Sequence, residues 1–242
     1  MYEALFQPMK IGELEIKNRF VMPAMNSHYA DAKHHMTEQA CNYYGERALG
    51  GFGLLITEFL CVSEEGLAYP MQAAIYDDEF ITSFSRLTGR VHENGGRIFA
   101  QLQHSGRMQG KGSTDKMAVG ASNIPYKANL IPVHELTEAE VKEVVKKFVD
   151  AAVRAQKAGF DGVEIHGAHG YLLAQFLSRG VNKRMDRYGG SVSNRARIVC
   201  EIVEGIKEAC GKAFPVCVRT SGDEGYDGGN RIEDAAAQAI LF

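Results

Sequence analysis

Residues 162–171 read GVEIHGAHGY: a short and mostly apolar run ends in a histidine, and a second histidine and a tyrosine follow at once. Four more runs of this kind occur along the chain, at residues 19–25, 52–58, 97–103 and 215–221. Because they are continuous rather than alternating, they are typical of strands in a parallel sheet that is covered on both faces. Helical patterns separate them, at residues 38–49, 77–93, 137–158, 191–210 and 231–242.

The helix at residues 137–158 has the clearest start and end. Thr137 and Glu140 form a T-x-x-E capping box, an apolar stripe at helical spacing follows, and Gly159 is a candidate C-cap. For the last helix we expect a cap made by Asn230 with Glu233. Ahead of the first strand, apolar and polar residues alternate around a glycine at residues 9–17, which predicts a small β-hairpin.

The polar residues at the strand ends decide between the two folds that strict strand–helix alternation allows, a doubly wound sheet and a (β/α)8 barrel. Four of the runs end in polar groups, which are Glu58, Gln101 with His104, His166 and Arg219. A barrel builds its active site from the carboxyl ends of several strands, whereas a doubly wound sheet binds its ligand at one switch point. We therefore predict an α/β fold of the TIM-barrel type.

Two observations refine this prediction. The near-match to a dinucleotide glycine motif, GGFG at residues 50–53, precedes its strand and is therefore a helix stop rather than a phosphate-binding turn. About five strand–helix units occupy all 242 residues, and three further units would need roughly 90 more. We expect residues 1–242 to form a single domain, a TIM barrel with an N-terminal β-hairpin that is C-terminally incomplete after about five units.

Composition narrows the function classes. A net charge of −3 without a basic stripe argues against nucleic acid as a partner. No apolar run approaches the length of a membrane span and the first residues do not read as a signal peptide, so we expect a cytoplasmic protein that does not bind membranes. The five cysteines form no C-x-x-C pair, which argues against a disulfide framework, a zinc site and an iron–sulfur site.

His166, His169 and Tyr171 are the strongest candidates for chemistry. Two imidazoles three residues apart at a strand end can direct two N–H donors at one oxygen, and a phenol two residues later can supply a proton. A loop whose histidines bind backbone carbonyls is the structural alternative. A metal site is a weak third interpretation, because no H-E-x-x-H motif and no evident third ligand accompany the pair.

Gln101 and Arg219 each allow two interpretations. The amide of Gln101 donates and accepts side by side and so matches a cyclic imide, such as the pyrimidine edge of a flavin, or it simply fills the polar rim of the barrel. Arg219 either forms a buried ion pair with a neighbouring carboxylate or binds a ligand that becomes anionic. A barrel lyase or aldolase is less well supported, because no lysine stands at the carboxyl end of a strand run to form a Schiff base.

Several motifs in their order along the chain resemble the old yellow enzyme family of FMN-dependent ene reductases, in the branch of enoate and 2,4-dienoyl-CoA reductases. They are LFQPMKIG at 5–12, KNRFVMPAM at 17–25, GLLITE at 53–58, QLQHSGR at 101–107, HGAHGY at 166–171, FLS at 176–178, NKRMDRYGGS at 182–191, NR at 194–195 and VR at 218–219. The resemblance implies an FMN-binding (β/α)8 barrel. It also implies reduction of the C=C bond of small α,β-unsaturated carbonyl compounds (enones, enoates or enoyl-CoA esters) with NADH or NADPH.

The resemblance also implies roles for single residues at the cofactor. Ala24, Met25 and Asn26 resemble the first-strand segment beside the flavin, and Phe59 resembles the second-strand position whose backbone reaches the ring. Gln101 resembles the amide that binds the pyrimidine edge. Arg219, carried over in the same way, resembles the cation next to N1 and the C2 carbonyl, where its charge stabilises the anionic reduced flavin.

For the substrate, the resemblance implies that His166 and His169 hold the carbonyl oxygen and that Tyr171 donates a proton. The implied mechanism is ping-pong: NAD(P)H reduces the flavin and leaves, and the reduced flavin passes a hydride to the β-carbon. An ordinary phenol pKa near 10 keeps Tyr171 protonated for transfer to the α-carbon.

Two departures from the family pattern limit what the resemblance implies. Asn26 stands where many relatives have Cys or Thr, so redox potential and substrate preference do not carry over. The family's late strands, whose loops grip the FMN phosphate, are missing from this chain, and this supports an alternative. The alternative is a non-catalytic fragment that does not retain FMN and acts by self-association, for example as a homo-oligomer, or by binding a partner. The specific substrate and the choice between NADH and NADPH stay open.

Overall fold

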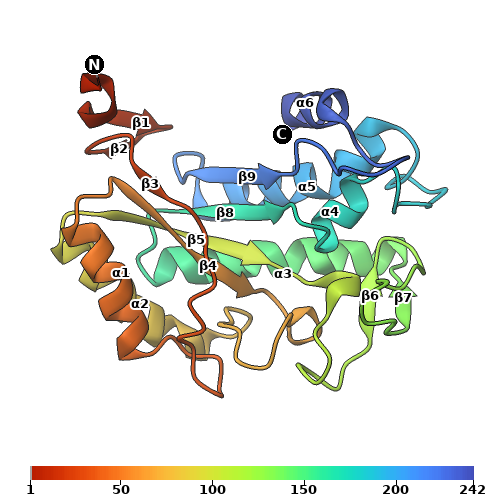
Figure 1. The fold of residues 1–242 in the computed structure, drawn as a ribbon, viewed down its shortest axis with the longest axis horizontal. Helices are drawn as coiled ribbons and strands as arrows, with labels where there is room; N and C mark the ends of the chain where they lie inside the picture. Colours follow the sequence, from red (N-terminus) through yellow and green to blue (C-terminus); the bar gives the residue numbers. More distant parts are fainter. Residues whose placement is uncertain (1) are drawn as a thin grey trace.

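A five-stranded parallel sheet organises the computed structural model, which describes residues 2–242 (Figure 1). Its strands are β3 (Val21–Met22), β4 (Leu54–Cys61), β5 (Arg97–Gln103), β8 (Gly162–Gly167) and β9 (Val216–Thr220). They lie side by side in chain order, so this sheet has no reversal of strand order of the kind at which a doubly wound fold binds its ligand. The arrangement agrees with the predicted barrel.

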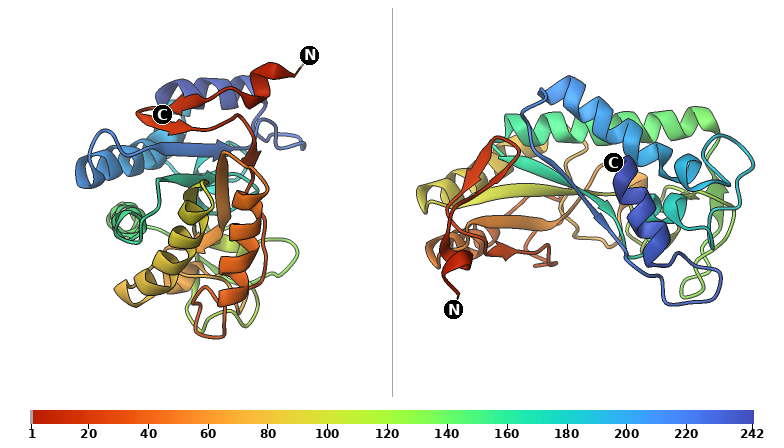
Figure 2. Two further views of the ribbon diagram at one scale, coloured as in Figure 1. Left: turned by 90° about the vertical axis from the view of Figure 1, so that its left-hand side faces the viewer. Right: turned by 90° about the horizontal axis from the view of Figure 1, so that it is seen from above.

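The helices follow one another around the outside of the curled sheet (Figure 2). They are α1 (Glu38–Leu49), α2 (Ile81–Glu93), α3 (Glu138–Lys157), α5 (Val192–Cys210) and α6 (Ile232–Leu241). The predicted capping box at the start of α3 is present, with the Glu140 N–H donating to Oγ1 of Thr137 at 3.3 Å. None of the helices within residues 2–242 has both the length and the apolar character needed to cross a bilayer.

The predicted cap of α6 is wrong. Arg231 occupies the N-cap position, and its N–H donates to Oδ2 of Asp234 at 3.1 Å. Asn230 cannot cap the helix because its side chain binds elsewhere, accepting from the Arg179 N–H at 3.1 Å and donating to the carbonyl of Leu177 at 3.0 Å.

Two strands and one helix differ from their predicted bounds by two residues or more, whereas the other predicted strands and helices of the main fold differ by at most one residue at each end. β3 has two residues instead of the predicted seven and stops before Pro23, which has no N–H to donate to a neighbouring strand. β4 starts two residues later than predicted and runs three residues further. The predicted helix at 77–93 begins with a 3-10 turn, η3 (Asp78–Phe80), where the side chain of Asp77 accepts the Glu79 N–H.

Apolar side chains form two cores on opposite faces of the sheet. The large core lies between the sheet and the helices, and Ala100, Leu102 and Ile165 belong to it. The small core lies on the concave face, where Leu54, Ile56 and Phe99 meet Ile16. Ile16 comes from the predicted hairpin, which forms as β1 (Met9–Ile11) and β2 (Leu14–Ile16), so the hairpin covers the amino-terminal part of this face.

The structure contains short elements that the patterns did not predict. β6 (Ala118–Gly120) and β7 (Val133–Glu135) form a two-stranded parallel sheet. The others are α4 (Leu172–Leu177) and the 3-10 turns η1 (Glu3–Phe6), η2 (Glu64–Gly66) and η4 (Gly106–Met108). β6, β7 and α4 lie at the end of the main sheet towards which β5, β8 and β9 point (Figure 1). Segments of three to six residues are too short to show a periodicity.

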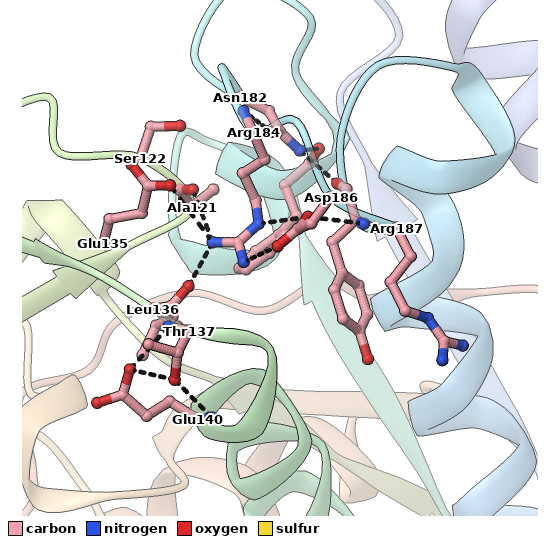
Figure 3. Close-up of polar contacts among 12 residues, drawn as sticks. Ala121, Ser122, Glu135, Leu136, Thr137, Glu140, Asn182, Arg184, Asp186 and Arg187 are labelled. Atoms are coloured by element: carbon pink, nitrogen blue, oxygen red, sulfur yellow. Dashed lines mark hydrogen bonds and ion pairs between the residues drawn. The ribbon is translucent and has the colours of Figure 1, made fainter.

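A buried arginine connects these short elements (Figure 3). The Arg184 guanidinium donates to the carbonyls of Ala121, at 3.2 Å, and Leu136, and it forms a two-pronged ion pair with Asp186. Its side chain is only 3% exposed. The loop between α4 and α5 is therefore tied to the ends of β6 and β7, beside the carboxyl end of the main sheet.

Candidate active site

The strand register brings four of the predicted site residues, together with Glu164, to the same face of the sheet. Gln101 pairs with Phe59 on one side and with Glu164 on the other, and His166 pairs with Arg219. Successive residues of a strand point to opposite faces, and Leu102 and Ile165 belong to the large helix-covered core. Gln101, Glu164 and His166 therefore lie on the concave face, as do their partners in register.

His166 ends this row as a buried and neutral imidazole. The Ala168 N–H approaches Nδ1 of His166 at 3.4 Å, so Nδ1 accepts and Nε2 carries the proton. Nε2 in turn lies 3.4 Å from Nδ1 of His169. Burial lowers the pKa of His166 to about 3, and the charges of His169 and Arg219 act in the same direction. At pH 7 this ring is a neutral hydrogen-bond donor.

His169 reaches the same place through an unusual backbone conformation. Its φ is +60°, in the left-handed region that few residues other than glycine adopt, although His, Asn and Asp are enriched there. The residue that follows β9 holds this turn, because the His169 N–H donates to Oγ of Ser221 at 3.2 Å. The two imidazoles stand nearly perpendicular, at 86°, with centroids 5.0 Å apart. Burial, followed by the charge of Arg219, lowers the pKa of His169 as well.

Tyr171, the N-cap residue of α4, completes the predicted cluster. Its ring centroid lies 5.1 Å from that of His166 and 5.4 Å from that of Phe59. Burial raises the pKa of Tyr171, so the phenol holds its proton at neutral pH. The fold thus brings together the three side chains that the sequence predicted to serve as two hydrogen-bond donors and a proton source.

Gln101 and Arg219 differ in how their side chains are bonded. Nε2 of Gln101 donates to Oε1 of Glu164 at 2.6 Å, which leaves its second amide hydrogen and its carbonyl oxygen available. Burial raises the pKa of Glu164, against the opposing effects of Gln101 and Arg219. Within residues 2–242, Arg219 makes no ion pair with a carboxylate. The structure therefore does not support the alternative in which Arg219 forms a buried ion pair with a neighbouring carboxylate.

The segment predicted to lie beside the flavin follows β3. Ala24 is half-buried, whereas Met25 and Asn26 are exposed. The next residue fixes the segment, because Ser27 donates through its hydroxyl to Oε1 of Glu58 at 2.5 Å and through its N–H to Oε2 at 3.3 Å. Glu58, at 0% exposure, thereby holds the loop after β3 against the end of β4.

Tyr69 is a site residue that the sequence patterns missed. Its hydroxyl donates to Oε2 of Glu58 at 3.2 Å, and its ring lies 5.9 Å from that of Phe59, so a second phenol stands near the cluster. Phe59 itself places its side chain among the rings of Tyr69, His166 and Tyr171, in addition to the predicted backbone role. Tyr69 lies in a long loop with no periodic pattern, and only the folded loop brings it here.

Within the described residues, no group of three or more His, Cys, Asp or Glu side chains is placed to hold a metal ion. A cavity of about 230 Å³ adjoins His169 instead. Its wall includes Arg107, Gln175, Glu224 and Tyr226.

Comparison with known proteins identifies the family. Residues 4–242 match the NADH:flavin oxidoreductase / NADH oxidase family. The chain belongs to this family. The NADH oxidase of Thermoanaerobacter brockii is 42% identical over 240 residues, which cover 98% of this chain and 37% of that protein. The cinnamate reductase of Clostridium sporogenes is 44% identical over 228 residues, which cover 91% of this chain and 34% of that protein.

A solved structure gives the same result for the fold. The old yellow enzyme homologue from Zymomonas mobilis is 32% identical, with a TM-score of 0.90 over 98% of this chain and 70% of that chain. The resemblance seen in the motifs and the predicted TIM-barrel fold are thus confirmed.

FMN and a nicotinamide donor, NADH or NADPH, are the cofactors of this family. The chain spans about a third of the length of the NADH oxidase and the cinnamate reductase.

Proposed function

We propose that this chain supplies the FMN-facing and substrate-facing residues of an NAD(P)H-dependent ene reductase, which reduces the C=C bond of α,β-unsaturated carbonyl compounds. One observation carries the proposal. The neutral pair of His166 and His169 stands beside the protonated Tyr171, at the carboxyl edge of the sheet face that also holds Gln101 and Arg219. Hydrogen-bond donors, a proton source and a cation are the groups that such a reduction needs.

The residues on this face fit FMN. Gln101 has one free amide hydrogen and a free carbonyl oxygen for an imide edge, and Arg219 is a cation without a carboxylate partner in residues 2–242. The segment of Ala24, Met25 and Asn26, in which Met25 and Asn26 are exposed, would border the same ring, next to Phe59. When bound, FMN would supply the hydride chemistry, taking a hydride from NADH or NADPH and, in a ping-pong sequence, giving it to the substrate.

The histidines and the tyrosine act on the substrate. His166 and His169 would donate hydrogen bonds to its carbonyl oxygen and so draw electron density from the conjugated double bond, which makes the β-carbon electrophilic. Tyr171 would then transfer its proton to the α-carbon. Because burial raises the pKa of Tyr171, the group is protonated at the start of the reaction. Aryl enoates are the first substrates to assay, since one relative is a cinnamate reductase.

The test begins with flavin binding. FMN is added to the purified chain, which is desalted and examined for a retained, shifted visible band and quenched fluorescence. With bound flavin, NADH and NADPH are expected to bleach the band, and an enone or enoate is expected to restore it. Tyr171→Phe should leave bleaching unchanged and slow the restoring step by roughly 10²–10⁴-fold, the usual contribution of a general acid.

Absence of retained flavin would refute the proposal for this chain and favour the fragment alternative. One structural feature supports that alternative: β3 and β9 each pair on one side only within the described sheet, and strand edges of this kind promote association. Size-exclusion chromatography with light scattering would then detect a homo-oligomer. Cytoplasmic location, and the absence of nucleic-acid and membrane partners, stay predictions.

A further inference from the structure

Glu164 is a buried carboxylate to which the proposed reduction gives no role. It lies within β8 on the concave face of the sheet, and 9% of its surface is exposed. In the strand register it pairs with Gln101 of β5 on one side and with Cys217 of β9 on the other. Glu164 therefore lies beside the amide that is proposed to bind the pyrimidine edge of FMN.

The structure gives this carboxylate no ion-pair partner within residues 2–242. Its hydrogen-bond partner there is the Gln101 amide, whose Nε2 donates to Oε1 of Glu164 at 2.6 Å. Arg219, two positions beyond Cys217 on β9, acts on it from further away. The Gln101 hydrogen bond and the Arg219 charge both lower the pKa of Glu164, against the larger effect of burial, and so favour its ionised form.

The other titratable side chains next to Glu164 on this face are uncharged at pH 7. Burial, followed by the charge of Glu164, raises the pKa of the Cys217 thiol, which therefore keeps its proton. His166, two residues further along β8, is neutral because burial lowers its pKa to about 3. Glu164 and Arg219 thus place one negative and one positive charge on the same part of the sheet, and a buried charge is screened only weakly.

We propose that the negative charge of Glu164 offsets that of Arg219 at the bound flavin and so lowers the flavin reduction potential. This rests on the FMN binding in the proposed function. Hydride transfer delivers two electrons and one proton from NADH or NADPH, which leaves as NAD⁺ or NADP⁺, so the reduced flavin gains one negative charge. Arg219 stabilises that charge and Glu164 opposes it, which makes the reduced flavin a stronger hydride donor to the substrate.

The experiment measures the potential of FMN bound to the full chain against a dye of known potential at about pH 8, well above the range of a carboxyl group. Glu164→Gln removes the charge and keeps the shape of the side chain and a hydrogen-bond acceptor. It should shift the equilibrium about tenfold towards reduced FMN, which is about 30 mV for a two-electron couple. Glu164→Asp keeps the charge and shortens the side chain, and should change the equilibrium by less than about threefold.

Glu201→Gln is the matched control. Glu201 lies in α5, outside the sheet, where its carboxylate also accepts a hydrogen bond, from the Tyr188 hydroxyl at 2.8 Å. The same isosteric loss of charge at this position should leave the potential unchanged. If Glu164→Gln does not fold, Glu164→Met takes its place, since it is also uncharged and brings no amide into the buried site, and the same tenfold shift is expected.

Two results would overturn the inference. One is an unchanged potential in the uncharged variant. The other is a larger shift in Glu164→Asp than in Glu164→Gln, because a residue that only holds the Gln101 amide in place depends on its length more than on its charge. The proposed function fails by different results: an enone that does not reoxidise the retained flavin refutes it and leaves the measured potentials standing, whereas a chain that retains no FMN refutes both.

Discussion

Replacing Arg184 with methionine should destabilise the chain by about 3 kcal/mol. The substitution keeps most of the apolar stem and removes the guanidinium (Figure 3). Asp186 and the carbonyls of Ala121 and Leu136 then lose their donor. Removing one partner of a buried ion pair costs roughly 3–5 kcal/mol. Because the Asp186 side chain is 25% exposed, water can replace part of the interaction, and the lower end of that range applies.

Urea denaturation followed by circular dichroism measures the loss, which corresponds to a midpoint lower by roughly 1 M at the usual urea dependence. Arg187→Met is the matched control from the same loop. The Arg187 side chain is 47% exposed and its ion pair with Glu201 spans 3.2 Å, so its removal should cost less than about 1 kcal/mol. A loss below 1 kcal/mol for Arg184→Met, or equal losses for the two variants, would refute the reasoning.

The pH dependence of the same variant supplies a second check. Burial alone would raise the pKa of Asp186, but the hydrogen bonds from Arg184 and from the Tyr188 N–H outweigh it and hold the pKa below its usual value. The stabilisation is therefore complete above the unfolded pKa of about 3.9 and is lost as the pH falls through the folded pKa. The difference between the unsubstituted chain and Arg184→Met should shrink below about pH 4.

Three further predictions concern other parts of the fold. In Gly162→Ala the new Cβ would lie 2.6 Å from the ring of Phe99, so the free energy of unfolding should fall by about 1–3 kcal/mol in the same urea titration. Gly89→Ala is the control: its new Cβ would have no atom within 4 Å, so this variant should be neutral or stabilising. Thr137→Ala removes the N-cap of α3 and should cost about 1 kcal/mol; an unchanged midpoint would contradict the capping role. His166 should stay neutral in an NMR titration down to about pH 4, and because its folded pKa is lowered to about 3, its contribution should make the chain less stable as the pH falls from about 6.5 towards 3.

Local signals account for the parts of the fold that the sequence predicted best. Residues 38–49 and 97–103 match α1 and β5 at both ends, because helix caps, apolar runs and turn residues act over a few positions. The assignment of polar residues to strand ends was equally local. Parallel strands share a carboxyl edge, so Gln101, His166 and Arg219 could be expected at one edge before any contact was known.

Contacts between distant segments account for what the sequence did not predict. The hydrogen bond from Ser27 to Glu58 joins residues 31 apart, and the bond from Arg184 to Ala121 joins residues 63 apart. Tyr69 and Arg107 reach the site only because the loops that carry them pack against other loops. The wrong cap at Asn230 has the same cause, since a tertiary contact with Leu177 outweighs the local capping preference.

The sequence by itself therefore determined the strand–helix alternation, the barrel type and the row of chemical groups along one sheet edge. Each of these depends on residues close together in the chain or on the geometry common to parallel strands. The tertiary structure alone decided which of those groups are neutral and which are already bonded. It also decided that the cations Arg107 and Arg219 form no ion pair with a carboxylate in residues 2–242. Burial, charge and hydrogen bonding at a site are set by side chains brought together from the whole fold, and local patterns in the sequence do not contain that information.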